Sequence, residues 1–535
     1  MEHFRHSSAR KELVAFVAAM GRGLTTSSSS SGGDDPKPKH LLRPHGGYRP
    51  ESPLDNLSPA LASLHGSLSC MSATWMDPNH DGIPPDLTVK ARFGNPAFRT
   101  WHARLVERSY SIVRCLMDCH AKNPISGSDG EEVVDESTKL KILTECYDQG
   151  FRAASNEGPA LWQHPDESSA DTTSKQEEII RELQAYLHDS FGHPIRIDYG
   201  TGHESSFVVF LLSLCKIGCF LWRSKEGDCK SPGNPPSEVI GLASLSLFHA
   251  YLKVTRGLQR DYMLEPAGSH GYVLSSFGYF APRSPQLTTA PLSILLSCRV
   301  WGLDDYHCIP FYLGACQMVA REQWQQQNRV QTKKSIISAQ DGASETGSDT
   351  NNDEDADNKI PDNPYLPDSA SHLLDPSAST DTHTDNHDHW TPSIIHNAQI
   401  LETYSPMYLY LSCIQFIRQI KPNVPFFESS PMLNDISHLG SWSKASSGLL
   451  RLYEGEVLDK KPVVQHFVFG NIFSASWTPS RTTPLEAPTR TFVNGPMGEE
   501  CIAPWAYSGG EDRRPPPPPQ SYPGGMPPTR APWAK

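Results

Sequence analysis

The sequence predicts an all-α protein whose helical segments are interrupted by long disordered insertions. Three observations support this class. Apolar residues recur at helical spacing, strand-like alternation is scarce, and stretches rich in serine, glycine, proline or acidic residues separate the periodic segments. Hydrophobic residues make up 37% of the 535 residues, less than in a typical compact domain, so part of the chain is expected to lie outside the packed core.

Packed and unpacked stretches alternate from the N-terminus onward. Serine, glycine and proline mark the linker and the tail, and clustered acidic residues mark the longest insertion. We expect an N-terminal helix at 1–24, a disordered linker at 25–56, a helical domain at 57–324 with a polar insertion at 121–177, an acidic disordered insertion at 325–392, the second part of the helical domain at 393–476, and a Pro-rich tail at 477–535.

Helices are predicted wherever apolar residues return every three or four positions. The segments with this spacing are 98–119, 140–151, 176–191, 237–263, 306–324, 405–420 and 440–456. Residues 205–223 are apolar on nearly all sides, which predicts a central buried helix. Its most apolar part, 207–222, is short and contains Lys216, so it is not expected to cross a bilayer, and no membrane partner is predicted.

The cysteines indicate a reducing compartment. Cys115 and Cys119, like Cys215 and Cys219, stand four residues apart on apolar helical stretches, a spacing typical of buried free thiols. A zinc pair is the alternative, although no second C-x-x-C motif completes it. We therefore expect a soluble cytoplasmic protein, with the nucleus left open as a second location.

The formal net charge of -13 comes mainly from the acidic stretch at 341–388. The remainder carries no basic patch, so nucleic acid is not an expected partner. Within the acidic stretch, His383, His387 and His389 alternate with aspartates. A metal-dependent hydrolase is one interpretation of this cluster. Incidental composition of a solvated linker is the other, and the scarcity of aromatic residues favours it.

Arg196 to Glu204 (RIDYGTGHE) is the segment with the clearest chemical signal. Gly200 and Gly202 precede a strongly helical stretch. Glycines let backbone N–H groups approach an anion, a helix N-terminus supplies positive potential, and Arg196 could add a bidentate phosphate contact. The alternative is a glycine turn in which Asp198 or Thr201 caps the helix.

A second segment, Trp301 to Tyr306, places Asp304 and Asp305 side by side ahead of a helix. Adjacent carboxylates suit Mg²⁺ that is held partly by nucleotide phosphates. Ordinary capping and compensation of the helix dipole is the alternative.

A third segment, Lys461 to Gly470, carries the polar pair Gln465 and His466 within an apolar run. Such a pair can line a pocket. More often it is a core pair with satisfied hydrogen bonds.

Together these segments resemble the motifs of the PTPA (phosphotyrosyl phosphatase activator) family, and they occur in the family's order over roughly 55–470. The closing Ala531 to Ala534 is similar to tails of fungal members. The matching segments are RFGNPAFRTWH at 92–102, RIDYGTGHE at 196–204, EPAGSHG at 265–271 with VWGLDDY at 300–306, SWSK at 441–444, and the stretch 462–470.

The resemblance implies an all-α fold with core, linker and lid parts and a deep ATP pocket beside a groove for a proline-containing peptide. It implies an ATP- and Mg²⁺-dependent activator of the catalytic subunit of type 2A serine/threonine phosphatases, and a peptidyl-prolyl cis–trans isomerase. By motif position, nucleotide contacts would fall on Arg196, Thr201, Gly202, Pro462, Gln465 and His466, and magnesium near Gly271 and Asp305.

One feature departs from the family pattern. Residues 272–299 separate EPAGSHG from VWGLDDY, which are continuous in the family. We interpret this segment as a translated, retained intron, because Gly271 to Val273 can be encoded with the donor sequence GTATGT and Cys298–Arg299 with an acceptor TGC-AGN. A genuine surface loop is the alternative. If the segment disrupts the nucleotide site, the chain would instead be a non-enzymatic adaptor that binds the phosphatase.

Overall fold

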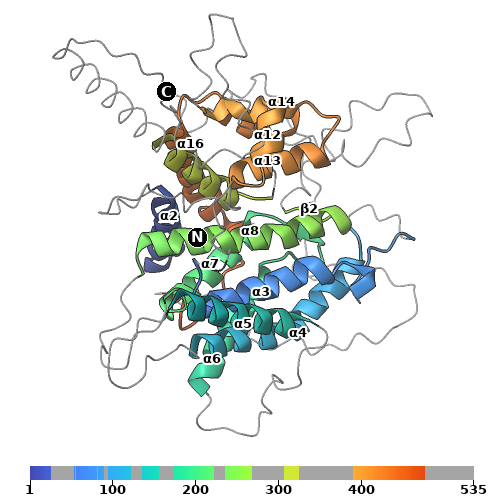
Figure 1. Ribbon diagram of the computed structural model, residues 1–535, viewed down its shortest axis with the longest axis vertical. Helices are drawn as coiled ribbons and strands as arrows, with labels where there is room; N and C mark the ends of the chain where they lie inside the picture. Colours follow the sequence, from blue (N-terminus) through green and yellow to red (C-terminus); the bar gives the residue numbers. More distant parts are fainter. Residues whose placement is uncertain are drawn as a thin grey trace, which may run out of the picture. The chain divides into compact units, whose positions relative to one another are not determined.

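The computed structural model confirms the all-α class, since its regular structure is helical apart from two short strands in the described part (Figure 1). The structure describes residues 1–25, 54, 56–80, 82–88, 94–121, 135–155, 174–221, 235–267, 306–323, 390–475 and 477. Nearly all of the predicted linker, acidic insertion and tail, and all of 272–299, lie outside these residues, so those boundaries stay predictions. The contacts below fall within one compact unit, Met1–Pro479.

The predicted N-terminal helix is divided into α1 (Glu2–Arg5) and α2 (Ser8–Thr25). The division falls at Ser7, whose hydroxyl oxygen accepts a hydrogen bond from the N–H of Arg10 at 3.1 Å and so caps a new helix. Helix α2 then packs against α8 (Ser237–Asp261). The side chain of Phe4 packs against Phe467 and Phe469, which come from the C-terminal part of the unit's sequence.

A group of four helices forms one side of the unit: α3 (Pro59–Thr74), α4 (Ala97–Ala121), α5 (Glu136–Ala154) and α6 (Ser174–Asp189). Ser58 caps α3 by accepting the N–H of Leu61, and Pro59 opens its first turn. Helix α5 lies inside the stretch predicted as a polar insertion, yet it packs on α3. A Cβ on Gly150 would stand 1.9 Å from the carbonyl oxygen of Ser63, so this glycine allows the two helices to approach closely. Part of the insertion therefore belongs to the core.

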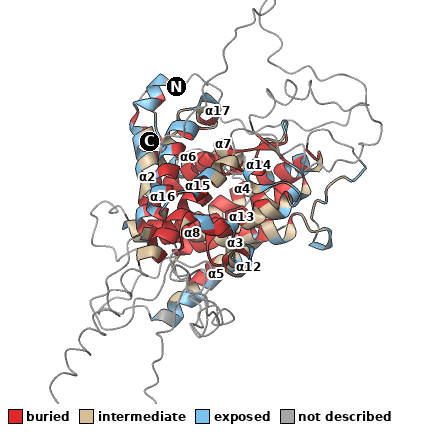
Figure 2. Cartoon of the chain, turned by 90° about the horizontal axis from the view of Figure 1, so that it is seen from above, coloured by how far each residue is buried: buried red, intermediate tan, exposed pale blue. Residues whose placement is uncertain are grey.

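The helix α7 (Thr201–Lys216) is buried on every side from Gly202 to Leu214, as the sequence predicts (Figure 2). Helix α8 contacts α3 on one side. On the other side its Arg256 donates to the hydroxyl of Ser412 at 2.9 Å, on α13 (Leu409–Ile420). Figure 1 shows α8 running between the α3–α6 group and the C-terminal helices. Helices α7 and α8 thus form the centre of the unit.

The C-terminal part supplies short helices and a segment that returns to α7. Residues 309–323 form one helix. The others are η7 (Pro392–His396), α12 (Ala398–Tyr404), α13, α14 (Phe426–Ser429), α15 (Pro431–Ser437), α16 (Trp442–Leu452), the π-helix η8 (Tyr453–Leu458) and α17 (Lys461–Val464). No helix in the described ranges has the length and apolarity needed to cross a membrane.

Two strands pair in parallel beside the start of α7. Strand β1 is Asp198–Tyr199 and β2 is Glu265–Pro266, in the register Asp198 to Glu265 and Tyr199 to Pro266. The N–H of Ala267 extends this pairing with a 2.7 Å bond to the carbonyl of Tyr199. The pairing therefore holds the start of EPAGSHG, at Glu265, against RIDYGTGHE, at Asp198.

Candidate functional site

The first turn of α7 carries backbone donors that no described residue satisfies. The helix begins at Gly200, which has no side chain to cap it. The first intrahelical bond runs from the N–H of Glu204 to the carbonyl of Gly200 at 3.1 Å. The N–H groups of Thr201, Gly202 and His203 therefore lack a helical acceptor. Together with the positive end of the helix dipole, they suit an anion.

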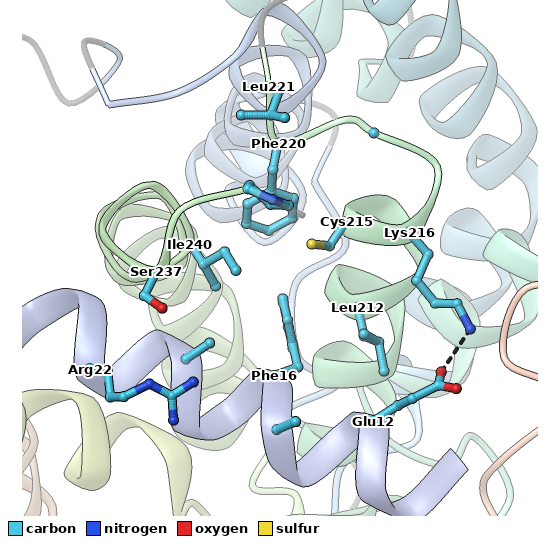
Figure 3. A pocket seen from close by; sticks show the side chains of 14 residues that line it. Glu12, Phe16, Arg22, Leu212, Cys215, Lys216, Phe220, Leu221, Ser237 and Ile240 are labelled. Carbon is cyan, nitrogen blue, oxygen red and sulfur yellow. Dashed lines mark hydrogen bonds and ion pairs between the residues drawn. The ribbon is translucent and has the colours of Figure 1, made fainter. Parts of the chain in front are cut away.

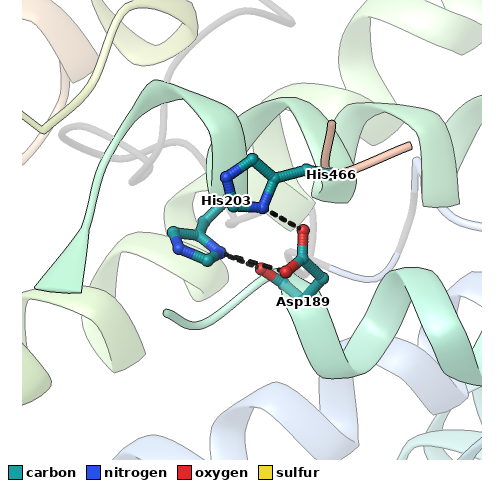
Figure 4. Close-up of side chains that lie close together, drawn as sticks. All are labelled: Asp189, His203 and His466. Atoms are coloured by element: carbon teal, nitrogen blue, oxygen red, sulfur yellow. Dashed lines mark hydrogen bonds and ion pairs between the residues drawn. The ribbon is translucent and has the colours of Figure 1, made fainter. Parts of the chain in front are cut away.

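The imidazole of His466 lies directly against this turn. A Cβ on Gly202 would stand 2.7 Å from Cδ2 and 2.9 Å from Nε2 of His466. Only glycine therefore lets the ring approach so closely. The His466 side chain is 9% exposed, and its Nδ1 bonds Oδ2 of Asp189 at 2.8 Å (Figure 4). The Cδ2–Nε2 edge thus faces Gly202 in the first turn of α7.

One face of α6 holds the segment that contains His466. The carboxylate of Glu182 accepts the N–H groups of Ile472 and Phe473, at 2.9 and 2.8 Å. The hydroxyl of Tyr186 donates to the carbonyl of Val468, and Asp189 binds His466. Positions 182, 186 and 189 are four and three residues apart and share one helix face. The segment 466–473 is therefore fixed to α6 at three points.

Asp189 forms a buried charged group with two imidazoles. Burial raises the pKa of Asp189, but the neighbouring His203 and then His466 outweigh it and hold this pKa below the ordinary range. Burial likewise lowers the pKa of His203, but the Asp189 carboxylate raises it above its ordinary value. Asp189 is therefore ionised at neutral pH, and a histidine proton compensates its charge.

Arg196 is linked to the same region through Asp198, whose Oδ1 is 4.0 Å from Nε2 of His203. Its Nε donates to Oδ2 of Asp198 at 2.8 Å; the Arg196 side chain is 42% exposed and that of Asp198 is 3% exposed. Between them, Ile197 has a φ of 53°, a left-handed conformation that a β-branched residue rarely adopts. Such backbone strain is concentrated at functional sites, where surrounding contacts enforce it. Here it accompanies an anchored guanidinium that still faces solvent.

The described ends of the interrupted motif, 265–267 and Tyr306, lie beside this site. The hydroxyl of Tyr306 donates to the carbonyl of Leu264 at 2.8 Å, next to β2. The fully buried Glu204 accepts the N–H groups of Cys308 and Ile309, at 2.8 and 3.1 Å, and so caps the helix at 309–323. The residues on either side of 268–305 therefore start and end beside α7. Gly271 and Asp305 themselves lie outside the described residues.

Comparison with known proteins identifies the family of this chain. A sequence model of the family described as "Phosphotyrosyl phosphate activator (PTPA) protein" matches residues 1–281 and 364–475. The chain belongs to this family. The resemblance found in the sequence motifs is thereby confirmed.

Fungal PTPA proteins are among the relatives of this chain. It is 30% identical over 401 residues to serine/threonine-protein phosphatase 2A activator 2 of Candida albicans, covering 71% of this chain and 77% of the relative. It is 29% identical over 458 residues to activator 1 of Neurospora crassa, covering 85% of this chain but 56% of that relative. The crystal structure of the PP2A phosphatase activator Ypa1 is similar with a TM-score of 0.43 and 22% identity, covering 88% of this chain and 91% of that one.

The structure brings together part of the site that the PTPA motifs imply. Thr201, Gly202 and His466 share the start of α7. Pro462 lies within α17 and Gln465 ends it; both are exposed, and α17 packs on α7. Three residues that support these positions, Glu182, Tyr186 and Asp189, lie outside the motifs. Two more, His203 and Glu204, belong to the RIDYGTGHE motif, but the sequence assigned them no role.

Asp189, His203 and His466 also form the one group of potential metal ligands in the described ranges, with ligand atoms within 4.8 Å of one another. The Nδ1 atoms of both imidazoles already bond Asp189. A cation would have to displace these protons. We therefore describe the group as a hydrogen-bonded cluster.

A separate cavity of about 430 Å³ lies at the other end of α7 (Figure 3). Apolar side chains that include Phe16, Leu212 and Ile240 line it, and Lys216 pairs with Glu12 at 2.8 Å on its edge. Leu212 is roughly 17 Å along the helix from Thr201. This cavity is therefore not part of the candidate site.

The hydrogen bonds that Glu182 on α6 accepts from Ile472 and Phe473 predict a selective loss of stability. Glu182→Ala leaves the buried N–H groups of Ile472 and Phe473 without an acceptor, so we expect the free energy of unfolding to fall by about 2–4 kcal/mol. Urea unfolding measures it. The control is Glu178→Ala, one turn away, whose carboxylate bonds only the exposed Asn471 side chain and should cost about 0.5 kcal/mol or less. Equal losses of unfolding free energy in the two variants would contradict this role of Glu182.

The charged group predicts a pH dependence. The folded-state pKa of Asp189 is depressed, so the unfolded state binds more protons and the stabilisation is lost as pH falls below the ordinary aspartate value of about 3.9. Asp189 also raises the pKa of His203, and this contribution is complete only below the ordinary histidine value of about 6.5. The difference in unfolding free energy between the wild type and Asp189→Asn should therefore be largest at about pH 5, between the ordinary aspartate and histidine values, and shrink toward pH 3. Urea unfolding across this acidic range checks this. A difference that still grows below the ordinary aspartate value would refute the assignment.

Proposed function

We propose that the chain is an ATP- and Mg²⁺-dependent activator of the catalytic subunit of type 2A serine/threonine phosphatases, with peptidyl-prolyl cis–trans isomerase activity. Family membership and the names of the relatives support the phosphatase partner. One observation carries the nucleotide site: the uncapped first turn of α7 faces the Nε2 edge of the buried His466.

In this proposal the phosphates of ATP occupy the start of α7. The N–H groups of Thr201, Gly202 and His203 bind phosphate oxygens as hydrogen-bond donors, and the helix dipole adds attraction. The exposed guanidinium of Arg196, which is paired with Asp198, supplies positive charge near the start of α7. Pro462 and Gln465, exposed on the neighbouring α17, contact the outer part of the nucleotide.

Magnesium is proposed to bind near Gly271 and Asp305, where it would offset the charge of the phosphates. The neighbouring residues support this position, since Ala267 is bonded to Tyr199 and Tyr306 to Leu264, both beside the start of α7. The described residues on either side of 268–305 therefore lie beside the start of α7, which supports the activator over a non-enzymatic adaptor.

The proposed isomerase activity requires no nucleophile. Rotation about an X–Pro bond has a barrier of roughly 18–20 kcal/mol, because amide resonance is lost. A groove that binds the twisted amide more tightly than either planar form lowers this barrier. A proline-containing peptide is therefore the proposed substrate, and no catalytic acid or base is assigned.

The nucleotide site is tested by Gly202→Ala. The new Cβ would overlap the His466 ring, so we expect the affinity for Mg-ATP to fall at least about tenfold, which corresponds to 1.4 kcal/mol. Arg196→Ala should also weaken binding, and calorimetric titration measures both. The matched control is Gly455→Ala, where an added Cβ meets nothing within 4 Å. Unchanged affinity in both site variants would refute the site.

The role of 272–299 is tested by deleting it. We expect pull-down of the phosphatase catalytic subunit to depend on Mg-ATP in both forms, and both to accelerate a proline-limited refolding reaction. Phosphatase binding without nucleotide dependence or acceleration would favour the adaptor. Transcript sequencing across the segment tests the retained intron, which fails if every messenger contains the 84 bases (3 × 28 codons, residues 272–299).

A further inference from the structure

Asp189, the last residue of α6, accepts hydrogen bonds from two imidazoles through two different parts of the residue. Its main-chain oxygen accepts from Nδ1 of His203 at 2.5 Å, and its carboxylate Oδ2 accepts from Nδ1 of His466 at 2.8 Å (Figure 4). The hydroxyl of Ser206 donates to the same Oδ2 at 2.7 Å. One residue therefore sets the state of both rings.

Carbonyl and carboxylate oxygens can only accept, so each Nδ1 must carry the hydrogen. In the neutral form of either ring, Nε2 is then the atom without a proton. For His466 this atom lies at the start of α7, 2.9 Å from where a Cβ on Gly202 would stand. The ring of His203 packs edge-on against it, with centroids 4.4 Å apart, and prevents it from turning away.

We propose that Asp189 is a positioning residue for nucleotide binding, which holds His466 with Nε2 directed at the phosphate that occupies the first turn of α7. This inference rests on the proposed function. When phosphate binds, the His466 ring takes up a proton at Nε2 and donates it in a hydrogen bond to a phosphate oxygen. The ionised carboxylate on the opposite side of the ring stabilises the resulting imidazolium, the role that a carboxylate performs for histidine in catalytic triads. Asp189 itself contacts no phosphate.

The structure supplies an internal control. The substitution Asp189→Ala removes the carboxylate, whose Oδ1 is 3.4 Å from Nδ1 of His203, but keeps the main-chain oxygen that accepts from the same Nδ1 at 2.5 Å. We expect nitrogen NMR of the imidazoles in the free protein, above the pH range where they titrate, to show both rings in the Nδ1–H form in the wild type. In Asp189→Ala, His203 should keep this form, which reports an intact site, while His466 should lose it.

Binding provides the second measurement. Asp189→Ala should weaken Mg-ATP binding at least about tenfold, since a hydrogen bond to a charged group contributes enough for such a change. The double variant Asp189→Ala/His466→Gln should bind within about twofold of His466→Gln alone, because Asp189 acts through that ring. Ser206→Ala, which removes another donor to the same oxygen, should keep the His466 form and the affinity within about twofold.

The inference is overturned if His466 keeps the Nδ1–H form in Asp189→Ala, or if the losses in the double variant add. It is also overturned if His466 loses the Nδ1–H form in Asp189→Ala while the affinity of this variant for Mg-ATP is unchanged. A wild-type protein that binds no Mg-ATP would instead refute the proposed function. The NMR result would then stand alone as the test of whether Asp189 orients His466.

Discussion

The unsatisfied first turn of α7 is the constraint on which the rest of the site depends. The turn presents three N–H groups without a helical acceptor, and such donors need a partner from outside the helix. Gly200 cannot cap them, and Gly202 leaves room for the His466 ring beside them. In the proposed function, the phosphates of the nucleotide are that partner. The elements around this turn, which are α6, the segment 466–473 and β1, hold it in place or carry charged groups beside it.

The support comes mainly from polar groups inside the helical unit. Glu182 and Glu204 are almost fully buried, and each accepts two backbone N–H groups from a segment distant in sequence. Glu182 fixes the end of the last motif, and Glu204 starts the helix at 309–323. A buried carboxylate with its hydrogen bonds satisfied gives a specific position to the segment it binds, because loss of any partner leaves a costly charge. The site is therefore assembled by carboxylates that have no proposed contact with the ligand.

Hydrogen bonds also fix the described residues on both sides of 268–305. Strands β1 and β2 pair on one side of 268–305, and Tyr306, Cys308 and Ile309 bond to residues beside or within α7 on the other. The cost of closing a loop grows only slowly with its length, whereas these contacts fix both of its ends. The described residues on either side of 268–305 are thus held beside α7 by their own hydrogen bonds.

The sequence by itself determined the all-α class, the buried character of α7 and the glycines ahead of it, because helical periodicity and glycine spacing are local properties. It also placed Thr201, Gly202 and His466 in one family motif set. It did not identify Glu182, Tyr186 or Asp189, although their spacing defines one face of α6. A shared face does not reveal its partner, and His466 is 277 residues from Asp189 along the chain. Only the tertiary structure decided that pairing, since a hydrogen bond requires an approach of about 3 Å that no sequence interval encodes.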